Sequence, residues 1–175
     1  MKVEKVIVGK LECNCYILSI KDECIVIDPG ADYLKIKDAI NNKSVKAVLI
    51  THNHFDHIGA LSNFDKNIVY DFSNLEEKEY QFSKFKFKVI KTPGHTSDLL
   101  TYYFFNDRVM FTGDFLFNNS IGRTDFPNSS SYDMINSLNK ISQYPDDTII
   151  YPGHGDSSTL RIEKNNIPMY ISYLN

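Results

Sequence analysis

Short apolar runs, separated by polar, glycine or proline breaks, dominate the chain and predict a protein built mainly from β-strands. Residues 1–28 contain three such runs and end at the breaker Asp28-Pro29-Gly30. The run over 45–50 predicts a buried strand that leads directly into a cluster of histidines. Further strands are predicted over 68–70, 85–89, 100–105, 108–112 and 148–151, the third and fourth of these forming a hairpin.

Two segments, 34–40 and 131–141, have apolar residues at roughly helical spacing. Helices and strands therefore alternate, with strands in the majority. Two β-sheets packed face to face with helices outside fit this order, and another mixed α/β layering fits it equally well. No internal repeat and no long linker interrupts the chain, so we expect one domain over residues 1–175.

The five histidines of the protein all follow strand-like runs and lie beside Gly, Thr, Asp or Asn. Three of them form the pattern His-x-His-x-Asp-His over residues 52–57. His52 and His54 leave a strand two residues apart, so their imidazoles share one face of the backbone and can bind one ion together. Asp56 and His57 follow where the chain turns, and their side chains can diverge toward a second ion.

Two ligands per ion do not complete a tetrahedral site, so further donors must come from elsewhere in the chain. Three candidates each follow an apolar strand and come directly after a glycine: His95, Asp114 and His154. Taken singly, each would be interpreted as an ordinary loop or turn residue. Together with the cluster at 52–57 they supply seven nitrogen and oxygen donors, which suits two ions that share a carboxylate and a water.

The order of these motifs resembles that of the metallo-β-lactamase superfamily. His-x-His-x-Asp-His, Gly-His, Thr-Gly-Asp and Pro-Gly-His-Gly follow one another along the whole chain. Several segments look like the glyoxalase II branch of that superfamily, the hydroxyacylglutathione hydrolases and their short relatives. These segments are Asn14-Cys15-Tyr16, Asp28-Pro29-Gly30, 111–114, 120–125 and 163–165.

The resemblance implies a four-layer αββα sandwich of mixed α/β (α+β) class, the metallo-β-lactamase fold, with two metal ions. The ligands that it implies are, for the first ion, His52, His54 and His95, for the second ion, Asp56, His57 and His154, and as the bridge between them, Asp114. Nitrogen and oxygen donors without a thiolate suit two zinc ions and would also accept iron or manganese.

In such a centre a water shared by both ions loses its proton near neutral pH, and the hydroxide attacks a carbonyl that one ion polarises. A thiolate leaves without a strong general acid, so the predicted function is a thioester hydrolase similar to the hydroxyacylglutathione hydrolases. Asp56 is the candidate catalytic residue, because besides ligating it can orient the hydroxide. Arg123 is a candidate substrate contact or else an ordinary surface arginine, and Asp28 either supports the site from behind or only forms a turn.

Composition is consistent with a small-molecule substrate. The 19 Lys and Arg residues against 22 Asp and Glu give a formal net charge of −3, which argues against a nucleic-acid partner. No apolar run is long enough to cross a membrane and the N-terminus is charged, so we expect a cytoplasmic protein without a membrane partner. Cys13, Cys15 and Cys24 lie in apolar segments, where we expect free, buried thiols.

Two departures from the glyoxalase II pattern bear on the substrate. Only 21 residues follow His154, whereas glyoxalase II itself has a helical C-terminal domain that holds glutathione, which puts glutathione in question. Thr96-Ser97-Asp98 follows His95 where relatives often have Thr-Pro-Gly, and the spacing from His57 to His95 is short. We therefore expect a trimmed loop and a more open pocket.

Other activities of the superfamily give alternative interpretations. A phosphodiesterase or ribonuclease would use the same ligands, but such nucleases usually carry an inserted domain or a basic exosite, and only 39 residues separate Asp114 from His154. A persulfide dioxygenase would bind one iron through two histidines and an aspartate, which leaves Asp56, His57 and His154 unexplained. β-Lactam hydrolysis fits poorly, because a bridging aspartate is typical of the thioesterase-like branches.

Overall fold

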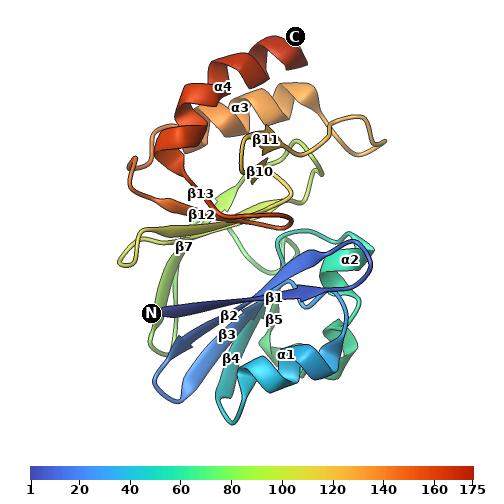
Figure 1. Cartoon of the computed structure of the whole chain (residues 1–175), viewed down its shortest axis with the longest axis vertical. Coiled ribbons are helices and arrows are strands. Elements are labelled where there is room, and N and C mark those ends of the chain that lie inside the picture. Colours follow the sequence, from blue (N-terminus) through green and yellow to red (C-terminus); the bar gives the residue numbers. More distant parts are fainter.

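Two β-sheets lie face to face and helices cover the outer face of each, as the computed structural model of residues 1–175 shows (Figure 1). The layers follow in the order α3 (Ser131–Ile141) with α4 (Leu160–Leu174), the second sheet, the first sheet, and α1 (Tyr33–Ile40). This arrangement is the four-layer αββα sandwich, and the predicted fold class is confirmed. None of the helices is long and apolar enough to cross a membrane.

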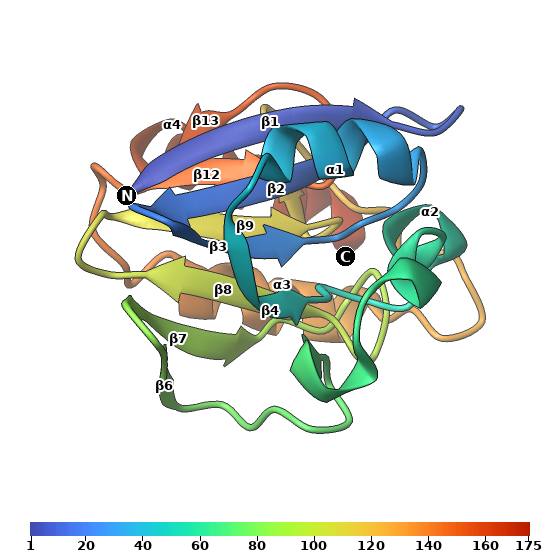
Figure 2. The same ribbon diagram turned by 90° about the horizontal axis from the view of Figure 1, so that it is seen from below.

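The first sheet has the strand order β1-β2-β3-β4-β5. The first three strands pair antiparallel, whereas β3, β4 and β5 run parallel, because α1 carries the chain from the end of β3 back to the start of β4 (Figure 2). Its strands are β1 (Lys2–Val8), β2 (Cys13–Ile20), β3 (Glu23–Ile27), β4 (Ser44–Leu49) and β5 (Val69–Tyr70).

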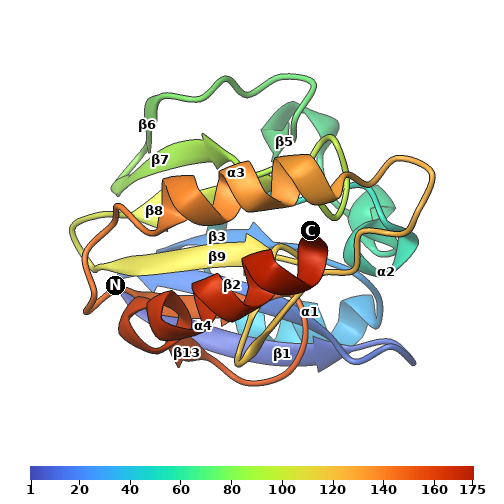
Figure 3. The same ribbon diagram turned by 90° about the horizontal axis from the view of Figure 1, so that it is seen from above.

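The second sheet has the order β13-β12-β9-β8-β7-β6. β6 to β9 form an antiparallel meander, β12 joins β9 in parallel, and α3 and α4 lie across the outer face (Figure 3). Its strands are β6 (Glu79–Phe82), β7 (Phe85–Lys91), β8 (Leu100–Phe104), β9 (Val109–Gly113), β12 (Ile149–Pro152) and β13 (Ser158–Thr159).

Several short elements lie between these strands. The hairpin of β10 (Leu116–Phe117) and β11 (Ser120–Ile121) follows the second sheet's β9. The one-turn helix α2 (Phe55–Ile58) follows β4, and two 3₁₀ turns, η1 (Leu61–Asn63) and η2 (Lys66–Ile68), lead from it to β5. α2 therefore begins within the predicted His-x-His-x-Asp-His motif.

Apolar side chains fill the space between the sheets because the strands alternate inward and outward positions. In β7, Phe85, Phe87 and Val89 are buried while Lys86 is exposed, as its period-two pattern predicts. The Phe87 ring packs against Tyr102 and Phe104 of the neighbouring strand. Burial of such aromatic side chains stabilises the face-to-face packing, at roughly 25 cal/mol for each Å² of apolar surface removed from water.

Most segments predicted from the pattern occur close to the predicted bounds, and the helix over 131–141 matches exactly in position. The C-terminal helix α4 was not predicted. Its buried residues Leu160, Ile167 and Tyr170 have helical spacing, but Pro168 lies inside the helix and is a residue that normally ends one. Packing against the second sheet outweighs this local preference.

Ends of strands from both sheets meet at one edge of the sandwich. The loop after β4 lies beside the loop before β8, since the backbone N–H of Leu100 donates to the carbonyl of Thr51 (2.8 Å). The Tyr102 hydroxyl donates to the carbonyl of Ile50 (2.6 Å) from the second sheet. Because β9 and β12 are parallel, the loops that follow them leave the second sheet at this same edge.

Candidate metal centre

All seven predicted ligands lie together at this edge. Both sheets contribute to the cluster, the first through the segment that follows β4 and the second through loops that follow β7, β9 and β12. The side chains form two groups whose ligand atoms lie within 4.8 Å of one another. The first group contains His52, His54, His95 and Asp114, and the second contains Asp56, His57, His154 and also Cys13.

Three imidazole nitrogens of the first group converge on one point. Nδ1 of His54 lies 3.0 Å from Nε2 of His52 and 3.1 Å from Nε2 of His95. Oδ2 of Asp114 lies 3.6 Å from Nε2 of His95 and 4.0 Å from Nε2 of His52. Three nitrogens and one carboxylate oxygen at these separations match the donor set of a tetrahedral ion.

The second group surrounds the other oxygen of the same carboxylate. Oδ1 of Asp114 lies 3.3 Å from Nε2 of His57 and 3.7 Å from Nε2 of His154. Oδ2 of Asp56 lies 3.2 Å from Nε2 of His154 and 3.7 Å from Nε2 of His57. The two oxygens of Asp114 therefore face different sets of donors, which is the arrangement of a carboxylate that bridges two ions.

The imidazoles turn their lone pairs inward because their outer nitrogens have partners. Nδ1 of His57 lies 3.0 Å from Oδ2 of Asp28, Nδ1 of His95 lies 2.9 Å from a backbone carbonyl, and Nδ1 of His154 lies 3.0 Å from another. The outer nitrogens accordingly carry the protons, which leaves each Nε2 as an acceptor. Nε2 of His57 and Oδ1 of Asp114 are buried without any hydrogen-bond partner. A cation between two facing acceptors of this kind would satisfy both, so the residues present fit a metal ion.

Asp28 is buried directly behind the second group. Its carboxylate accepts hydrogen bonds from the backbone N–H of Thr51 (2.8 Å) and the Thr51 hydroxyl (2.7 Å), besides that of His57. The Thr51 hydroxyl in turn lies 3.1 Å from Nδ1 of His52. Asp28 thus contacts His57 directly and His52 through Thr51, which is the placement that the predicted supporting role requires.

Electrostatics in the centre favour an ionised carboxylate at Asp114 and a neutral imidazole at His52. Burial alone would raise the pKa of Asp114, but His57, His52 and His154 outweigh burial and hold that pKa below its usual range. Burial, with His57 nearby, lowers the pKa of His52 well below its usual value. Metal ions bind these protonation states.

The pKa of His57 moves in the opposite direction. Burial lowers it, but the carboxylates of Asp28 and Asp114 on either side outweigh burial and raise it well above its usual value. A cation and a proton therefore compete for Nε2 of His57, and binding of an ion there would release a proton.

Comparison with known proteins identifies the family. The sequence profile of the metallo-beta-lactamase superfamily matches residues 8–72 and 62–154, which together include all seven ligand candidates. The chain belongs to the metallo-β-lactamase superfamily. The resemblance in the order of its motifs is thereby confirmed, and the sandwich is a metallo-β-lactamase fold.

Two curated members of the superfamily are similar over nearly their whole length. A probable metallo-hydrolase of Streptococcus pyogenes is 32% identical over 211 aligned positions, which cover 97% of this chain and 90% of the relative. The hydroxyacylglutathione hydrolase GloC of Haemophilus influenzae is 28% identical, with 96% of this chain and 97% of the relative covered. Both alignments are longer than the 175-residue chain, so each relative has residues that this chain lacks.

Solved structures of the superfamily superpose closely. BLEG-1, a B3 metallo-beta-lactamase, has a TM-score of 0.91 at 28% identity, covering 97% of this chain and 99% of that one. TTHA1623 in a di-iron-bound form has a TM-score of 0.83 at 27% identity, covering 95% of this chain and 100% of that one. ETHE1 from Myxococcus xanthus also has a TM-score of 0.83, at 26% identity, with 98% and 85% covered.

In this member of the superfamily a cavity of about 460 Å³ opens over both groups of ligands. Its rim is apolar: Leu11 is 54% exposed, Phe55 is 73% exposed, and Phe126 packs its ring against the imidazoles of His54 and His95. Exposed apolar side chains around a polar centre are typical of a small-molecule site.

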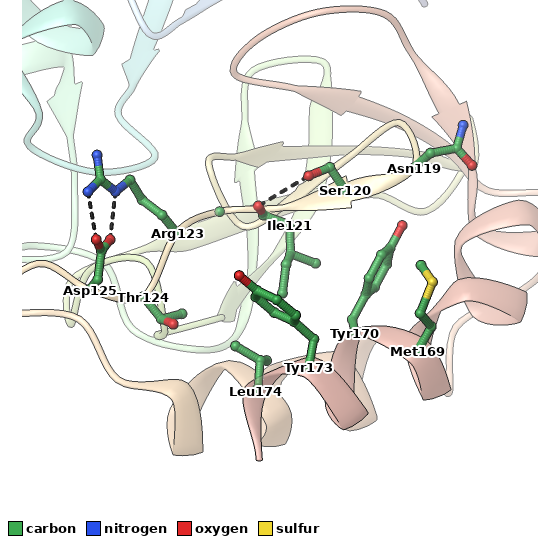
Figure 4. A pocket seen from close by; sticks show the side chains of 11 residues that line it. Asn119, Ser120, Ile121, Arg123, Thr124, Asp125, Met169, Tyr170, Tyr173 and Leu174 are labelled. Carbon is green, nitrogen blue, oxygen red and sulfur yellow. Dashed lines mark hydrogen bonds and ion pairs between the residues drawn. The ribbon is translucent and has the colours of Figure 1, made fainter.

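Arg123 lines this cavity and also a second one of about 600 Å³ beside the end of α4, whose lining Figure 4 shows. Its guanidinium binds both carboxylate oxygens of Asp125 (2.6 and 2.7 Å) and lies 4.4 Å from the centre of the Phe126 ring. Its backbone carbonyl is the partner of Nδ1 of His95. The side chain thus lines the cavity over the centre, and the backbone carbonyl orients the imidazole of His95.

Sequence reasoning assigned no role to several residues that contact the centre. Sγ of Cys13 lies 3.6 Å from Nδ1 of His57, and burial raises the pKa of this thiol to about 11. Cys13, Cys15 and Cys24 are all free and buried, as predicted. Thr51 and Phe126 were also missed. The position of Thr51, directly before the histidine cluster, is the one signal that pointed to any of them.

Proposed function

We propose that the chain is a binuclear metal-dependent hydrolase whose substrates are thioesters. Membership of the superfamily and the two groups of metal-binding residues support a metal-dependent hydrolase. The proposal of two ions rests on Asp114, because its two oxygens face separate sets of donors, at 3.3 Å from His57 and 3.6 Å from His95. One ion would leave one of these sets without a function.

Metal ions bound by these two groups of residues would supply an acidified water and a polarised carbonyl. We assign five imidazoles and two carboxylates to binding and orienting, with Asp114 as the bridge. Asp56 has the further role of orienting the nucleophile. Its Oδ2 lies 3.2 Å from Nε2 of His154, and its side chain is 14% exposed toward the cavity, where a water can reach it.

The composition of the cavity supports a thiolate as the leaving group. Its lining contains no lysine, no tyrosine and no carboxyl group outside the ligand set, so no general acid stands ready for an amine or alkoxide. A thiolate leaves without protonation, because its conjugate acid has a pKa near 8.5. Similarity to GloC, a hydroxyacylglutathione hydrolase matched over 97% of its length, also supports a glutathione thioester.

We propose Arg123 as the residue that contacts the substrate beyond the reacting carbonyl. The guanidinium is 61% exposed, and its ion pair with Asp125 is correspondingly weak. A carboxylate or amide carbonyl of the substrate can therefore bind the same donors at little cost. The second cavity beside Arg123 offers room for the thiol part of such a substrate (Figure 4).

We propose zinc as the metal, and the donor set would also accept iron or manganese. The similar protein TTHA1623 has been solved in a di-iron-bound form, which supports two ions without deciding the element. Free buried thiols suit a reducing compartment, so we place the enzyme in the cytoplasm with a small-molecule substrate.

One experiment tests the function directly. Metals in the purified protein are quantified, and hydrolysis of S-D-lactoylglutathione is measured before chelation, after chelation and after zinc is restored. We expect two metal ions per chain, with turnover lost on chelation and recovered with zinc.

Three parallel substrates separate the alternatives. Cleavage of bis-p-nitrophenyl phosphate without thioester hydrolysis would indicate a phosphodiesterase. One iron per chain with oxygen uptake on glutathione persulfide would indicate a dioxygenase. Nitrocefin tests β-lactam hydrolysis, the activity in the description of the similar BLEG-1. Any of these results in the absence of thioesterase activity would contradict the proposal.

A further inference from the structure

The loop that carries His154, residues 152–155, is held mainly by the opposite sheet. The backbone N–H of Asn14 donates to the carbonyl of Gly153 (2.7 Å), and the Tyr16 hydroxyl donates to the carbonyl of Pro152 (2.6 Å). Nδ1 of His154 itself is bonded to the carbonyl of Leu11 (3.0 Å). All three partners lie at or near the start of β2 in the first sheet, although His154 follows β12 in the second.

Asn14 makes the largest contribution from a single side chain. Its amide nitrogen donates to the carbonyls of Pro152 (3.0 Å) and Gly155 (2.9 Å), on either side of His154. The residue is 1% exposed, so the amide has no alternative partner in water. Asn14 therefore fixes the backbone both before and after the imidazole.

Within its own sheet the segment is held by the pairing of Pro152 with Gly113 at the end of β12. The backbone N–H of Gly153 donates to the carbonyl of Gly113 in its own sheet (2.8 Å), and Lys5 makes an exposed bond to Gly155 (3.2 Å). Beyond His154 the chain is open to solvent, because Gly155 and Asp156 are exposed. The imidazole of His154 is itself 27% exposed, whereas that of His57 is fully buried.

The first group of ligands has no such dependence on β2. His95 is oriented within the second sheet's own loops, by the backbone carbonyl of Arg123 and by the Ser129 hydroxyl, which donates to the His95 carbonyl (2.7 Å). His52 and His54 belong to the segment after β4. Asp28 and Thr51 link His57 to His52, but no residue of β2 hydrogen-bonds to His52, His54 or His95.

We propose that Asn14 is a positioning residue for the second group of ligands, so that the affinity of the second ion depends on the docking of β2 against the His154 loop while that of the first ion does not. This inference rests on the two-ion centre proposed above. It follows from the juxtaposition of Asn14 with the carbonyls of Pro152 and Gly155.

Asn14→Ala removes both side-chain bonds, so that only the Tyr16 hydroxyl still donates to the Pro152 carbonyl and only the exposed Lys5 to the Gly155 carbonyl. Loss of a hydrogen bond that orients a ligand typically lowers metal affinity about 10- to 100-fold. We expect a loss of this size for the second ion and less than about threefold for the first, since hydrogen bonds around His95 are unchanged.

The experiment is a zinc titration of the metal-free full-length protein, followed by two-bond ¹H–¹⁵N spectra of the five imidazoles. Zinc shifts the nitrogen that binds it, so each histidine reports its own occupancy. In wild type, signals from both groups should respond. In Asn14→Ala, His154 should respond only at higher zinc concentrations than His95 does.

Ser129→Ala is the matched control, because it removes a side-chain bond to the loop of His95 in the first group. It should weaken zinc binding at His95 relative to His154, the reverse of the effect of Asn14→Ala. A general loss of stability would weaken both groups together in both variants.

Tyr16→Phe keeps the test decisive if Asn14→Ala does not fold. It removes one hydroxyl and retains the ring, so the expected weakening at His154 is about two- to tenfold. If His95 and His154 respond at the same zinc concentration in Asn14→Ala or in Tyr16→Phe, as in wild type, the inference about Asn14 is overturned while the two-ion centre stands. A wild-type protein with only one responding group would instead overturn the two-ion centre.

Discussion

Oδ2 of Asp28 lies 3.0 Å from Nδ1 of His57, on the side of the imidazole that faces away from Asp114. The carboxylate fixes the tautomer in which Nε2 is free to bind an ion. Asp28 itself is fixed by two bonds from Thr51, one from its backbone and one from its hydroxyl. A chain of contacts therefore runs from the end of β3 to the second group of ligands.

Asp28→Asn should lower zinc affinity about 10- to 100-fold, because an amide nitrogen at the Oδ2 position cannot accept the His57 proton. Competition with a chromophoric chelator measures this affinity. Asp65→Asn, which changes an exposed carboxylate at the start of η2, is the control and should bind zinc like wild type. Unchanged affinity in Asp28→Asn would mean that Asp28 is only a turn residue.

His54→Ala should reduce thioester hydrolysis at least about a hundredfold, because the substitution removes a metal ligand itself and not a residue that orients one. Nδ1 of His54 lies between the Nε2 atoms of His52 and His95, and no neighbouring donor can replace it. The free energy of unfolding of the metal-free protein should change by less than about 1 kcal/mol. The neighbouring Asn53→Ala is the control and should retain activity; full activity of His54→Ala would remove the hydrolase assignment.

Gly153→Ala should abolish binding at the second group. A Cβ atom there would lie 2.3 Å from Oδ1 of Asp114 and 2.7 Å from Cε1 of His57, so these side chains would have to move. Gly155→Ala meets no atom within 4 Å but has φ +74°, and should only cost about 1–2 kcal/mol of stability. Zinc stoichiometry of the two variants separates a steric effect on the site from backbone strain.

Stability in alkaline solution should depend on Cys24, because burial raises the pKa of its thiol to about 11. The folded state favours the neutral thiol, so its contribution is complete below the unfolded pKa of about 8.5. The contribution is lost as the pH rises through about 11. Urea unfolding should therefore show a smaller loss of stability above pH ~9 in Cys24→Val than in wild type. Equal losses would contradict this assignment.

Arg123→Gln should raise KM for S-D-lactoylglutathione about tenfold, a loss of about 1.4 kcal/mol in binding, with kcat little changed. Arg108→Gln is the matched control, because Arg108 also forms an exposed ion pair, with Asp147, but lies at the opposite end of β9 from Asp114. A KM that is unchanged in Arg123→Gln would leave this residue as an ordinary surface arginine.

The convergence of the seven candidate ligands could be predicted because the signal that marks them is local and chemical. His52, His54, Asp56 and His57 are adjacent in sequence, and the other three candidates each follow a glycine at the end of an apolar strand. Two of these glycines have positive φ, 151° at Gly94 and 51° at Gly113, as a tight turn requires. Gly153 is needed because a Cβ atom there would collide with Asp114 and His57, and not because of its φ angle.

Other features depend on contacts that no local pattern encodes. Asn14 contacts the His154 loop at sequence separations of 138 and 141 residues, and its residue type gives no hint of a partner. In the sequence Cys13 resembles an ordinary core cysteine. It lies near His57 only because β2 packs beside α2. Helix α4 was missed because Pro168 interrupts its helical pattern of apolar residues. The helix forms nevertheless, because it packs against the second sheet.

Anomalous diffraction from crystals grown with zinc tests the central claim most directly. Two peaks should appear on opposite sides of the Asp114 carboxylate, one about 2.0–2.2 Å from nitrogens of His52, His54 and His95, the other equally close to His57 and His154. A single peak, or a second peak away from Asp114, would contradict the binuclear centre.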